Sequence, residues 1–350
     1  MVMGVISRSK NVLVQRGWAG ACWSIRDGQQ FWTGKKKNAE LQQRAMATLA
    51  YDELLVPEKG SFDGMRTVMF MHGLLGSGRN LRTFAKRLAS RAQEQSAADF
   101  PGWRLIMVDL RNHGRSADRG FTPPHDIPSA AKDVVDLIKT SSFGWPDIVI
   151  SHSMGGKVAL EYSSKAAAGY YGDALQPKQL WVLDTIPGKI PVVNDFGEVE
   201  HVLSTIEGLP DPLPSRRWLV DYMLEKGHSR SLAEWLGSNL KRAGSGEEMT
   251  WVFNPREATE MLNSHREADY WPVLESPPKD MEIHIVRAVK SVRWLPDVVS
   301  RLEKLSNTGK IFYHVLQNAG HWVHVDNPEG LADIIVPSLV KLNKTENNKQ

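Results

Sequence analysis

The sequence predicts a protein of the α/β class with a mostly parallel, doubly wound sheet. Short apolar runs rich in β-branched residues alternate with segments of helical periodicity, which is typical of strands joined by crossover helices. The alternation stops between Pro187 and Pro278, which indicates an insertion in the sheet domain. The apolar runs lie near residues 67, 104, 147, 180, 283 and 311, and the helical segments are 81–95, 128–140, 153–168, 296–305 and 328–342.

The composition limits the class of protein further. The chain has 350 residues, enough for one α/β unit with an insertion. Its one cysteine, Cys22, excludes an internal disulfide and leaves no thiol nucleophile in the predicted sheet domain. No stretch is long and apolar enough to span a membrane, and the net charge of +3 gives no sign of a nucleic-acid partner. No His-Glu-x-x-His motif is present, and the sequence calls for no metal or other cofactor.

Residues 1–50 differ from the rest of the chain. They hold eight basic residues against two acidic ones, Asp27 and Glu40, and account for the positive net charge. A basic, serine-containing and acid-poor N-terminus is typical of a mitochondrial or plastid transit peptide, so we predict an organellar location. The alternatives are a disordered extension of a cytoplasmic protein, or translation that starts at Met46.

A glycine-rich loop follows the strand predicted at 66–71, which counts as the third strand of this architecture. The buried strand 66–71 ends in His-Gly-Leu-Leu-Gly-Ser-Gly at 72–78. Such a loop can turn a backbone N–H toward a developing oxyanion, and Leu74 is the candidate donor. No Gly-Lys-Ser/Thr follows, which argues against a phosphate-binding loop. We also expect His72 and Gly73 to line a substrate pocket.

The most informative segment surrounds Ser153. The apolar run 147–150 leads into small residues, then this serine, then small residues again, and then the helix-compatible segment 157–162. This pattern is typical of a nucleophile elbow, a strained strand-to-helix turn that exposes a serine at the edge of the sheet. The backbone comes close to its neighbours two positions either side of the serine, where Ser151 and Gly155 stand. Met154, directly after the serine, is the second candidate oxyanion donor.

The candidate general base lies near the other end of the chain. His321 follows the strand 311–316 and a glycine turn. From a loop beyond the last strand, an imidazole can reach the elbow and accept the proton of Ser153. We interpret His324 as a packing residue at the start of the final helix.

Two aspartates can supply the carboxylate that orients the imidazole. Asp184 ends the strand near 180 and is the favoured candidate. Asp297 lies in the loop region after the strand near 283, but Pro296 before it predicts the first turn of a helix. Ser291, in the same loop, is a candidate auxiliary group that hydrogen-bonds the imidazole. The acid would stabilise the protonated imidazole.

The segment 188–278 predicts a helical cap inserted between strands 6 and 7 of the core. Helical periodicity covers 216–226 and 231–242 and carries an apolar stripe. We expect Trp218 and Tyr222 from this stripe, together with Trp322 beside the candidate base, to line the pocket. The core then comprises 51–187 and 279–343, and 344–350 form a polar tail.

Taken together, these segments resemble the α/β-hydrolase superfamily. Within it the chain is most similar to the branch of alpha/beta-hydrolase domain-containing protein 11 and its bacterial acyl-esterase relatives. Arg-Asn-His-Gly at 111–114 narrows the resemblance to this branch, although we interpret those residues themselves as turn-forming rather than substrate-binding. The segments that carry the resemblance are 72–77, 108–116, 152–157, 183–187 and 318–324.

The resemblance implies an esterase or thioesterase that acts on acyl substrates. It also implies an aspartate after the sixth strand and a serine after the seventh, which supports Asp184 together with Ser291. The chain departs from the family pattern at two places: Ser151 replaces a glycine, and Ala-Val-Lys at 288–290 replaces Gly-Gly-Asn.

The sequence therefore predicts a serine hydrolase of carboxylic esters or thioesters. Ser153 would attack the acyl carbonyl after His321 accepts its proton, and water would release the acyl-enzyme. The partner is then a small-molecule acyl ester or thioester, and nothing in the sequence names a partner protein. One alternative keeps the same triad in an acyltransferase or lyase. Another is a non-catalytic protein of this fold that binds a ligand or a protein partner.

Overall fold

The computed structural model describes residues 47–58, 63–191 and 198–347, together with three short strands before residue 47. Two compact units result, Met1–Ala47 and Thr48–Gln350. In the first, β1 (Val14–Arg16), β2 (Cys22–Arg26) and β3 (Gln29–Trp32) pair antiparallel in that order. The other residues of the segment 1–46 lie outside the described residues.

The second unit is built on a seven-stranded sheet with the order β12-β11-β8-β7-β5-β6-β4. Every neighbouring pair is parallel except β4 and β6, so the prediction of a mostly parallel sheet is confirmed. The strands are β4 (Ala50–Val56), β5 (Arg66–Met71), β6 (Trp103–Asp109), β7 (Ile148–His152), β8 (Gln179–Leu183), β11 (Glu282–Ala288) and β12 (Phe312–Leu316).

Strand β4 shows that the core begins before residue 51, its predicted start. Ala50 pairs with Asp109 of β6, and Leu49 before it is buried. The sheet domain therefore includes residues that the sequence assigned to the leader, because an edge strand of mixed polarity gives little periodic signal. The central strands β7 and β8 are buried along their whole length, which explains their continuous apolar runs.

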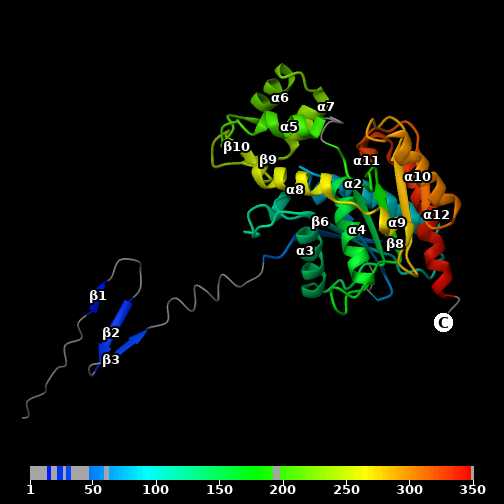
Figure 1. Cartoon of the computed structure of the whole chain (residues 1–350), viewed down its shortest axis with the longest axis horizontal. Coiled ribbons are helices and arrows are strands. Elements are labelled where there is room, and N and C mark those ends of the chain that lie inside the picture. The colour runs from blue at the N-terminus through cyan, green and yellow to red at the C-terminus, as the bar shows by residue number, and fades with distance from the viewer. Residues whose placement is uncertain are drawn as a thin grey trace, which may run out of the picture. The chain divides into compact units, whose positions relative to one another are not determined.

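Helices cover both faces of the sheet (Figure 1). Helices α2 and α12 contact each other and enclose a core with Val68, Phe70 and Trp181 on one face. Helices α3 and α4 pack together on the other face, toward which alternate strand residues point. The helices are α2 (Gly78–Glu94), η1 (Gly114–Ser116), α3 (Ile127–Thr140), α4 (Met154–Ala167), α10 (Pro296–Asn307), α11 (Val323–Asp326) and α12 (Pro328–Asn347).

The end of α12 corrects the predicted tail. The helix continues to Asn347, so most of the segment 344–350 extends the last helix instead of forming a separate tail. Residues 348–350 lie outside the described part of the chain.

The insertion between β8 and β11 is mainly helical, as predicted. The segment predicted as a helix over 231–242 is shorter, because α7 ends at Ser238 and the following residues form a two-stranded hairpin. Helix α8, which the sequence did not predict, lies between the rest of the cap and the sheet in Figure 1. The elements are α5 (Glu198–Ile206), α6 (Arg216–Glu225), α7 (Arg230–Ser238), β9 (Leu240–Arg242), β10 (Met249–Trp251), α8 (Pro255–Glu267) and α9 (Trp271–Glu275).

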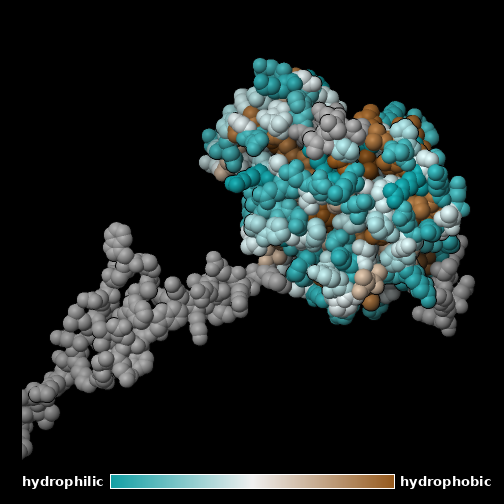
Figure 2. All heavy atoms as spheres, viewed as in Figure 1, coloured by the Kyte–Doolittle hydropathy of each residue, from teal (hydrophilic) through white to brown (hydrophobic). Residues whose placement is uncertain are grey.

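The visible surface of this unit is largely hydrophilic (Figure 2). Hydrophobic residues gather where the cap meets the sheet domain. Within the described residues, no helix combines the length and apolar character needed to cross a bilayer.

Candidate active site

Ser153 occupies a strained turn between β7 and α4. Its backbone has φ 53 and ψ −121, a conformation that is costly for a residue with a side chain. Its N–H donates to the Leu183 carbonyl at 3.0 Å, and its own carbonyl accepts from the Thr185 hydroxyl at 2.9 Å. The turn is therefore held by the end of β8, and the serine side chain stands at the carboxyl edge of the sheet.

Different contacts explain the small residues two positions after and two positions before Ser153. A Cβ on Gly155 would lie 2.5 Å from the His72 carbonyl oxygen, so a larger residue cannot fit there. Ser151, which replaces the family's glycine, is fully buried, and its hydroxyl donates to the Trp181 carbonyl at 2.8 Å. The departure at this position is thus accommodated by one buried hydrogen bond.

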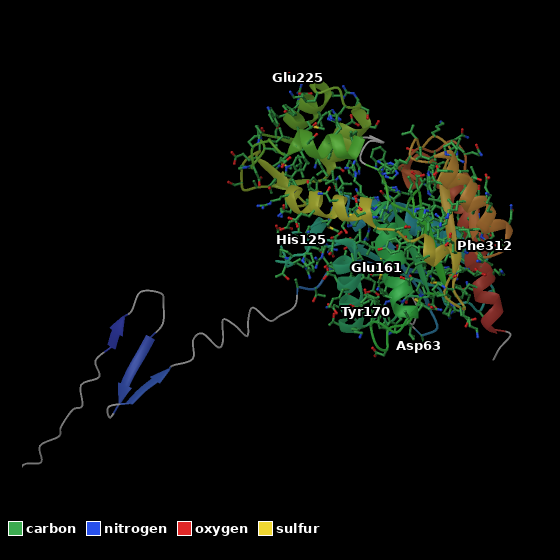
Figure 3. All side chains as sticks on the ribbon, viewed as in Figure 1. Asp63, His125, Glu161, Tyr170, Glu225 and Phe312 are labelled. Atoms are coloured by element: carbon green, nitrogen blue, oxygen red, sulfur yellow. The ribbon has the colours of Figure 1, made fainter. Side chains whose placement is uncertain are left out.

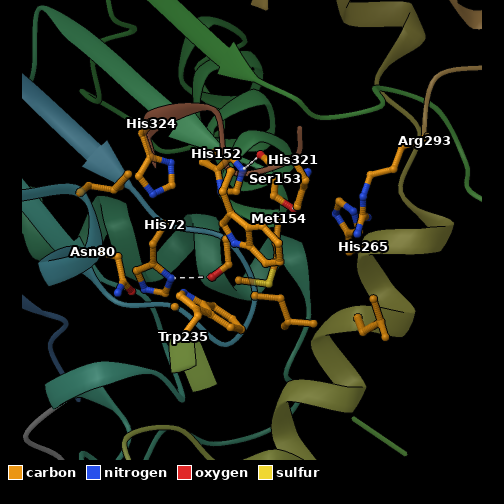
Figure 4. Close-up of a pocket in the computed structure, with 16 residues that line it drawn as sticks. His72, Asn80, His152, Ser153, Met154, Trp235, His265, Arg293, His321 and His324 are labelled. Carbon is orange, nitrogen blue, oxygen red and sulfur yellow. Dashed lines mark hydrogen bonds between the residues drawn. The ribbon is translucent and has the colours of Figure 1, made fainter. Parts of the chain in front are cut away.

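Three side chains from separate loops form a continuous hydrogen-bonded chain, of which Figure 4 shows Ser153 and His321. The Ser153 Oγ lies 3.0 Å from His321 Nε2, and His321 Nδ1 lies 2.7 Å from Asp184 Oδ2. The loops follow β7, β12 and β8, whose carboxyl ends meet at one edge of the sheet. The structure thus joins His321 to Asp184, whereas the alternative acid Asp297 is exposed in the first turn of α10.

Asp184 is held by several donors besides His321. Its Oδ1 accepts from the Ala288 N–H at 3.0 Å and from the Trp294 indole at 2.6 Å. Burial alone would raise the pKa of Asp184, but the hydrogen bonds from His321, Trp294 and Ala288 lower it below its ordinary value. The carboxylate is therefore ionised and fixed in orientation.

Ser291 contacts a different group from the one predicted. Its hydroxyl donates to Asp184 Oδ2 at 2.8 Å, so it supports the acid and not the imidazole that the sequence suggested. Trp294, which sequence reasoning missed, completes the set. The sequence held one indication of this donor, because the Trp294 indole N–H lies only three residues after Ser291, the predicted auxiliary residue.

The two candidate oxyanion donors, Leu74 and Met154, both line the pocket at Ser153. The Met154 N–H begins α4, and the first N–H groups of a helix have no intrahelical acceptor. The positive end of the helix also favours negative charge at this point.

Two buried histidines brace the loop that carries Leu74. His72 bonds the Gly73 carbonyl through Nδ1 at 2.7 Å, and its Nε2 accepts from the Leu110 N–H at 3.0 Å. His113 Nε2 accepts from the Leu75 N–H at 3.0 Å. Burial lowers the pKa of His72 to about 4 and that of His113 to about 3, so both rings are neutral. His113 therefore acts as the structural residue that the sequence predicted.

A further pair of histidines supports the loop of His321. His152 Nε2 bonds the His321 carbonyl oxygen at 2.7 Å, and burial lowers the pKa of His152 well below its ordinary value. His324 is buried and packs edge-on against the His152 ring at 5.2 Å between centroids. Its position agrees with the predicted packing role.

The pocket at Ser153 holds about 640 Å³ of space, including its open mouth. His72, Gly73 and Trp322 line it, as predicted. The cap contributes Trp235 from α7 and Leu262 and His265 from α8. The full lining is His72, Gly73, Leu74, Gly76, Asn80, Leu81, His152, Ser153, Met154, Trp235, Leu262, His265, Arg293, His321, Trp322 and His324.

The prediction that Trp218 and Tyr222 line this pocket was wrong. Helix α6 buries Leu219 and Met223, while Trp218 and Tyr222 stack on each other with centroids 5.3 Å apart. Figure 3 shows Glu225, the last residue of α6, at the outer edge of the cap. An amphipathic stripe identifies the packed face of a helix, but not the cavity that it faces.

The model of the alpha/beta hydrolase family matches residues 68–334, so the chain belongs to that family. It is 25% identical over 275 residues to the mouse protein named sn-1-specific diacylglycerol lipase ABHD11, covering 78% of this chain and 80% of that one. It is also 25% identical over 278 residues to the Escherichia coli esterase YbfF, covering 75% of this chain and 89% of that one. A solved marine microorganism esterase has the same fold, with a TM-score of 0.65, 19% identity, and coverage of 84% of this chain and 99% of that one.

Proposed function

We propose that the protein is a serine hydrolase that cleaves carboxylic ester or thioester bonds of acyl substrates. The observation that carries the proposal is the hydrogen-bonded series Ser153–His321–Asp184 beside two candidate oxyanion donors. Relatives named lipase and esterase support the same reaction class.

In the proposed mechanism, His321 Nε2 accepts the proton of Ser153 as Oγ attacks the acyl carbonyl carbon. The Leu74 and Met154 N–H groups stabilise the negative charge that develops on the carbonyl oxygen. The protonated imidazole, stabilised by Asp184, then delivers its proton to the departing alkoxide or thiolate. His321 then accepts a proton from a water molecule that attacks the acyl carbonyl carbon, and it returns the proton to Ser153 Oγ as the carboxylic acid is released.

The apolar walls of the pocket support an acyl chain as the group that is bound. Trp235 and Trp322 face each other with centroids 5.7 Å apart, and Leu262 lies on the same lining. Burying methylene groups against such walls stabilises the complex by about 0.8 kcal/mol for each group.

The test is Ser153→Ala, compared with the unchanged chain. We expect a serine-directed fluorophosphonate to label the wild type but not the variant, and p-nitrophenyl ester turnover to fall on the order of 10⁶-fold because the triad acts as a unit. Circular dichroism provides the folding control. A well-folded wild type that takes no label would contradict the proposal and favour a ligand-binding protein of this fold.

We also propose that residues 1–50 direct the protein to a mitochondrion or plastid, on the basis of their basic and acid-poor composition. The test is a fluorescent protein fused behind this segment. A matched fusion carries glutamine at the four arginines, Arg8, Arg16, Arg26 and Arg44. Organellar fluorescence that is lost in the matched fusion supports the proposal, and cytoplasmic fluorescence from both fusions contradicts it.

A further inference from the structure

The pocket at Ser153 has an unbalanced charge. Among the residues that the structure describes, no aspartate or glutamate lines it, whereas one arginine does. The arginine is Arg293, which lies in the segment between β11 and α10. A hydrolase of neutral acyl esters needs no fixed positive charge in its pocket. The Arg293 guanidinium therefore indicates a further binding role for this pocket.

The segment that carries Arg293 is held in position by the residues on either side of it. Ser291 two positions earlier and Trp294 directly after it both donate to Asp184. The segment that carries the guanidinium is therefore anchored to the same carboxylate that orients His321. The Arg293 side chain is half-buried, and a guanidinium stays charged at every pH a protein tolerates.

Asp184 does not neutralise this charge by an ion pair of its own. Its two oxygens already accept from His321, Ala288, Ser291 and Trp294. An ionised carboxylate offers about four acceptor positions, and all are used by these groups.

His265 stands beside Arg293 in the pocket (Figure 4). It comes from α8, is 6% exposed, and its Nδ1 has no hydrogen-bond partner within the described residues. Lys157 fixes the backbone of this residue by donating to its carbonyl oxygen at 2.6 Å. Burial lowers the pKa of His265 well below its ordinary value, and the charges of Lys157 and Arg293 add to this effect. The neutral ring still has one N–H to donate.

We infer that Arg293 and His265 form a subsite for an anionic oxygen group on the substrate, separate from the ester that is cleaved. The guanidinium supplies paired donors that match a carboxylate or a phosphate, and the imidazole supplies a further N–H. The anion would supply the negative charge that the pocket lining lacks. The inference rests on the proposed function and specifies its substrate class as acyl esters or thioesters that carry a second, negatively charged group.

The experiment compares substrates that differ only in that group. For a charge on the acyl part, the pair is the p-nitrophenyl monoester of glutaric acid and p-nitrophenyl valerate, which have the same chain length. For a charge on the alcohol part, the pair is a lysophosphatidic acid and the monoacylglycerol with the same acyl chain. The measured quantity is the ratio of kcat/KM for the anionic to the neutral member of each pair.

Three variants isolate the role of Arg293. Arg293→Gln removes the charge with little change in length, and Arg293→Lys restores a charge without the paired donors. Arg217→Gln, on α6 with a side chain that is 92% exposed, is the matched control. We expect the wild-type ratio to exceed about 10 for one pair, to fall about 10-fold or more in Arg293→Gln, and to recover partly in Arg293→Lys, because charge-assisted hydrogen bonds are lost and partly restored.

The outcomes separate this inference from the proposed function. Turnover of the neutral esters with a ratio near one that Arg293→Gln does not change would overturn the inference and leave the hydrolase intact. Absence of turnover on all four substrates would contradict the proposed function. In that case, calorimetric binding of monoethyl glutarate to Ser153→Ala, lost on adding Arg293→Gln, would still support the anion subsite, and its absence would overturn it.

Discussion

Asp184 shows how much one residue depends on its surroundings in this site. It lies at φ 45 after β8, and its side chain is buried with donors on both oxygens. The donors come from two segments, the end of β11 with the loop after it and the loop after β12, so the carboxylate fixes the position of His321 relative to Ser291 and Trp294. A strained backbone at such a position is maintained by these contacts.

Asp184→Asn should lower kcat by about 10⁴-fold, because an amide favours the wrong imidazole tautomer and cannot stabilise the protonated ring. Asp297→Asn is the matched control and should leave kcat within about 2-fold, because that side chain is exposed on α10. Steady-state turnover of one p-nitrophenyl ester measures both. If only the Asp297 variant loses activity, the assignment of the acid is wrong.

Asp184→Asn should also change how the free energy of unfolding depends on pH in the acidic range. The pKa of Asp184 is lower in the folded protein than its ordinary value of 3.8, so its contribution to stability is present above that value and is lost as the pH falls below it. The free energy of unfolding of the wild type should therefore exceed that of Asp184→Asn near neutral pH, and the difference should shrink toward about pH 3. Urea unfolding at a series of pH values measures it. A difference that stays constant would contradict the ionised, stabilised carboxylate.

At the scale of elements, the cap helices divide their tasks. Helices α7 and α8 send Trp235, Leu262 and His265 to the pocket. Helix α6 buries Leu219 and Met223 within the unit and keeps its own aromatic pair away from the lining. The cap is therefore both a packed layer and one wall of the site.

Trp235→Ala should lower kcat/KM about 10-fold for an octanoyl ester and less for an acetyl ester, because the longer chain loses more apolar contact. Trp218→Ala removes the same kind of side chain from the same cap and should change both values by less than about 3-fold. Equal effects of the two variants on both esters would show that the loss reflects cap folding and not contact with the acyl chain.

At the scale of the whole hydrolase unit, one buried lysine joins the cap to the sheet domain. Lys157 on α4 is fully buried, and its ammonium donates to the carbonyl oxygens of Gly188, His265 and Ala268 at 2.6–2.8 Å. These carbonyls lie where the cap begins and where α8 ends. Burial lowers the pKa of Lys157 to about 7, and the charges of Asp269 and Glu267 oppose this shift.

Lys157→Met should lower the free energy of unfolding by about 2–4 kcal/mol, because three buried carbonyls lose their donor while the volume of the side chain is nearly kept. Chemical unfolding measures the loss. Limited proteolysis should cleave the cap faster in the variant, while Lys189→Met, an exposed neighbour in the cap, should leave both quantities close to those of the wild type. An unchanged cleavage rate would contradict the role of Lys157 in holding the cap.

The stability difference between the wild type and Lys157→Met should increase with pH above neutrality. The folded pKa of Lys157 lies below its ordinary value of 10.5, so between about pH 7 and that value the unfolded chain binds more protons than the folded one. The stability of the wild type relative to Lys157→Met should therefore rise from about pH 7 to pH 9. A flat or falling difference over this interval would contradict the lowered pKa.

Local patterns in the sequence determined much of this protein. The strand, serine and small residues around Ser153 predicted the elbow, because its turn depends on a few consecutive residues. The carboxyl ends of parallel strands lie at one edge of a sheet. This rule predicted that Asp184 and His321 lie close together, and they do in the structure. The α/β class followed from alternation alone.

Only the tertiary structure decided which distant side chains complete the site. Trp294, Arg293 and His265 carry no periodic or turn signal, and Trp235 replaced Trp218 because packing sets the rotation of each cap helix. The strand that replaced the end of a predicted helix at Leu240–Arg242 depends on pairing with Met249–Trp251. The sequence by itself determined the backbone that presents the candidate nucleophile, base and acid. The walls and charge of the pocket depended on contacts between segments far apart in the chain, which local residue patterns do not encode.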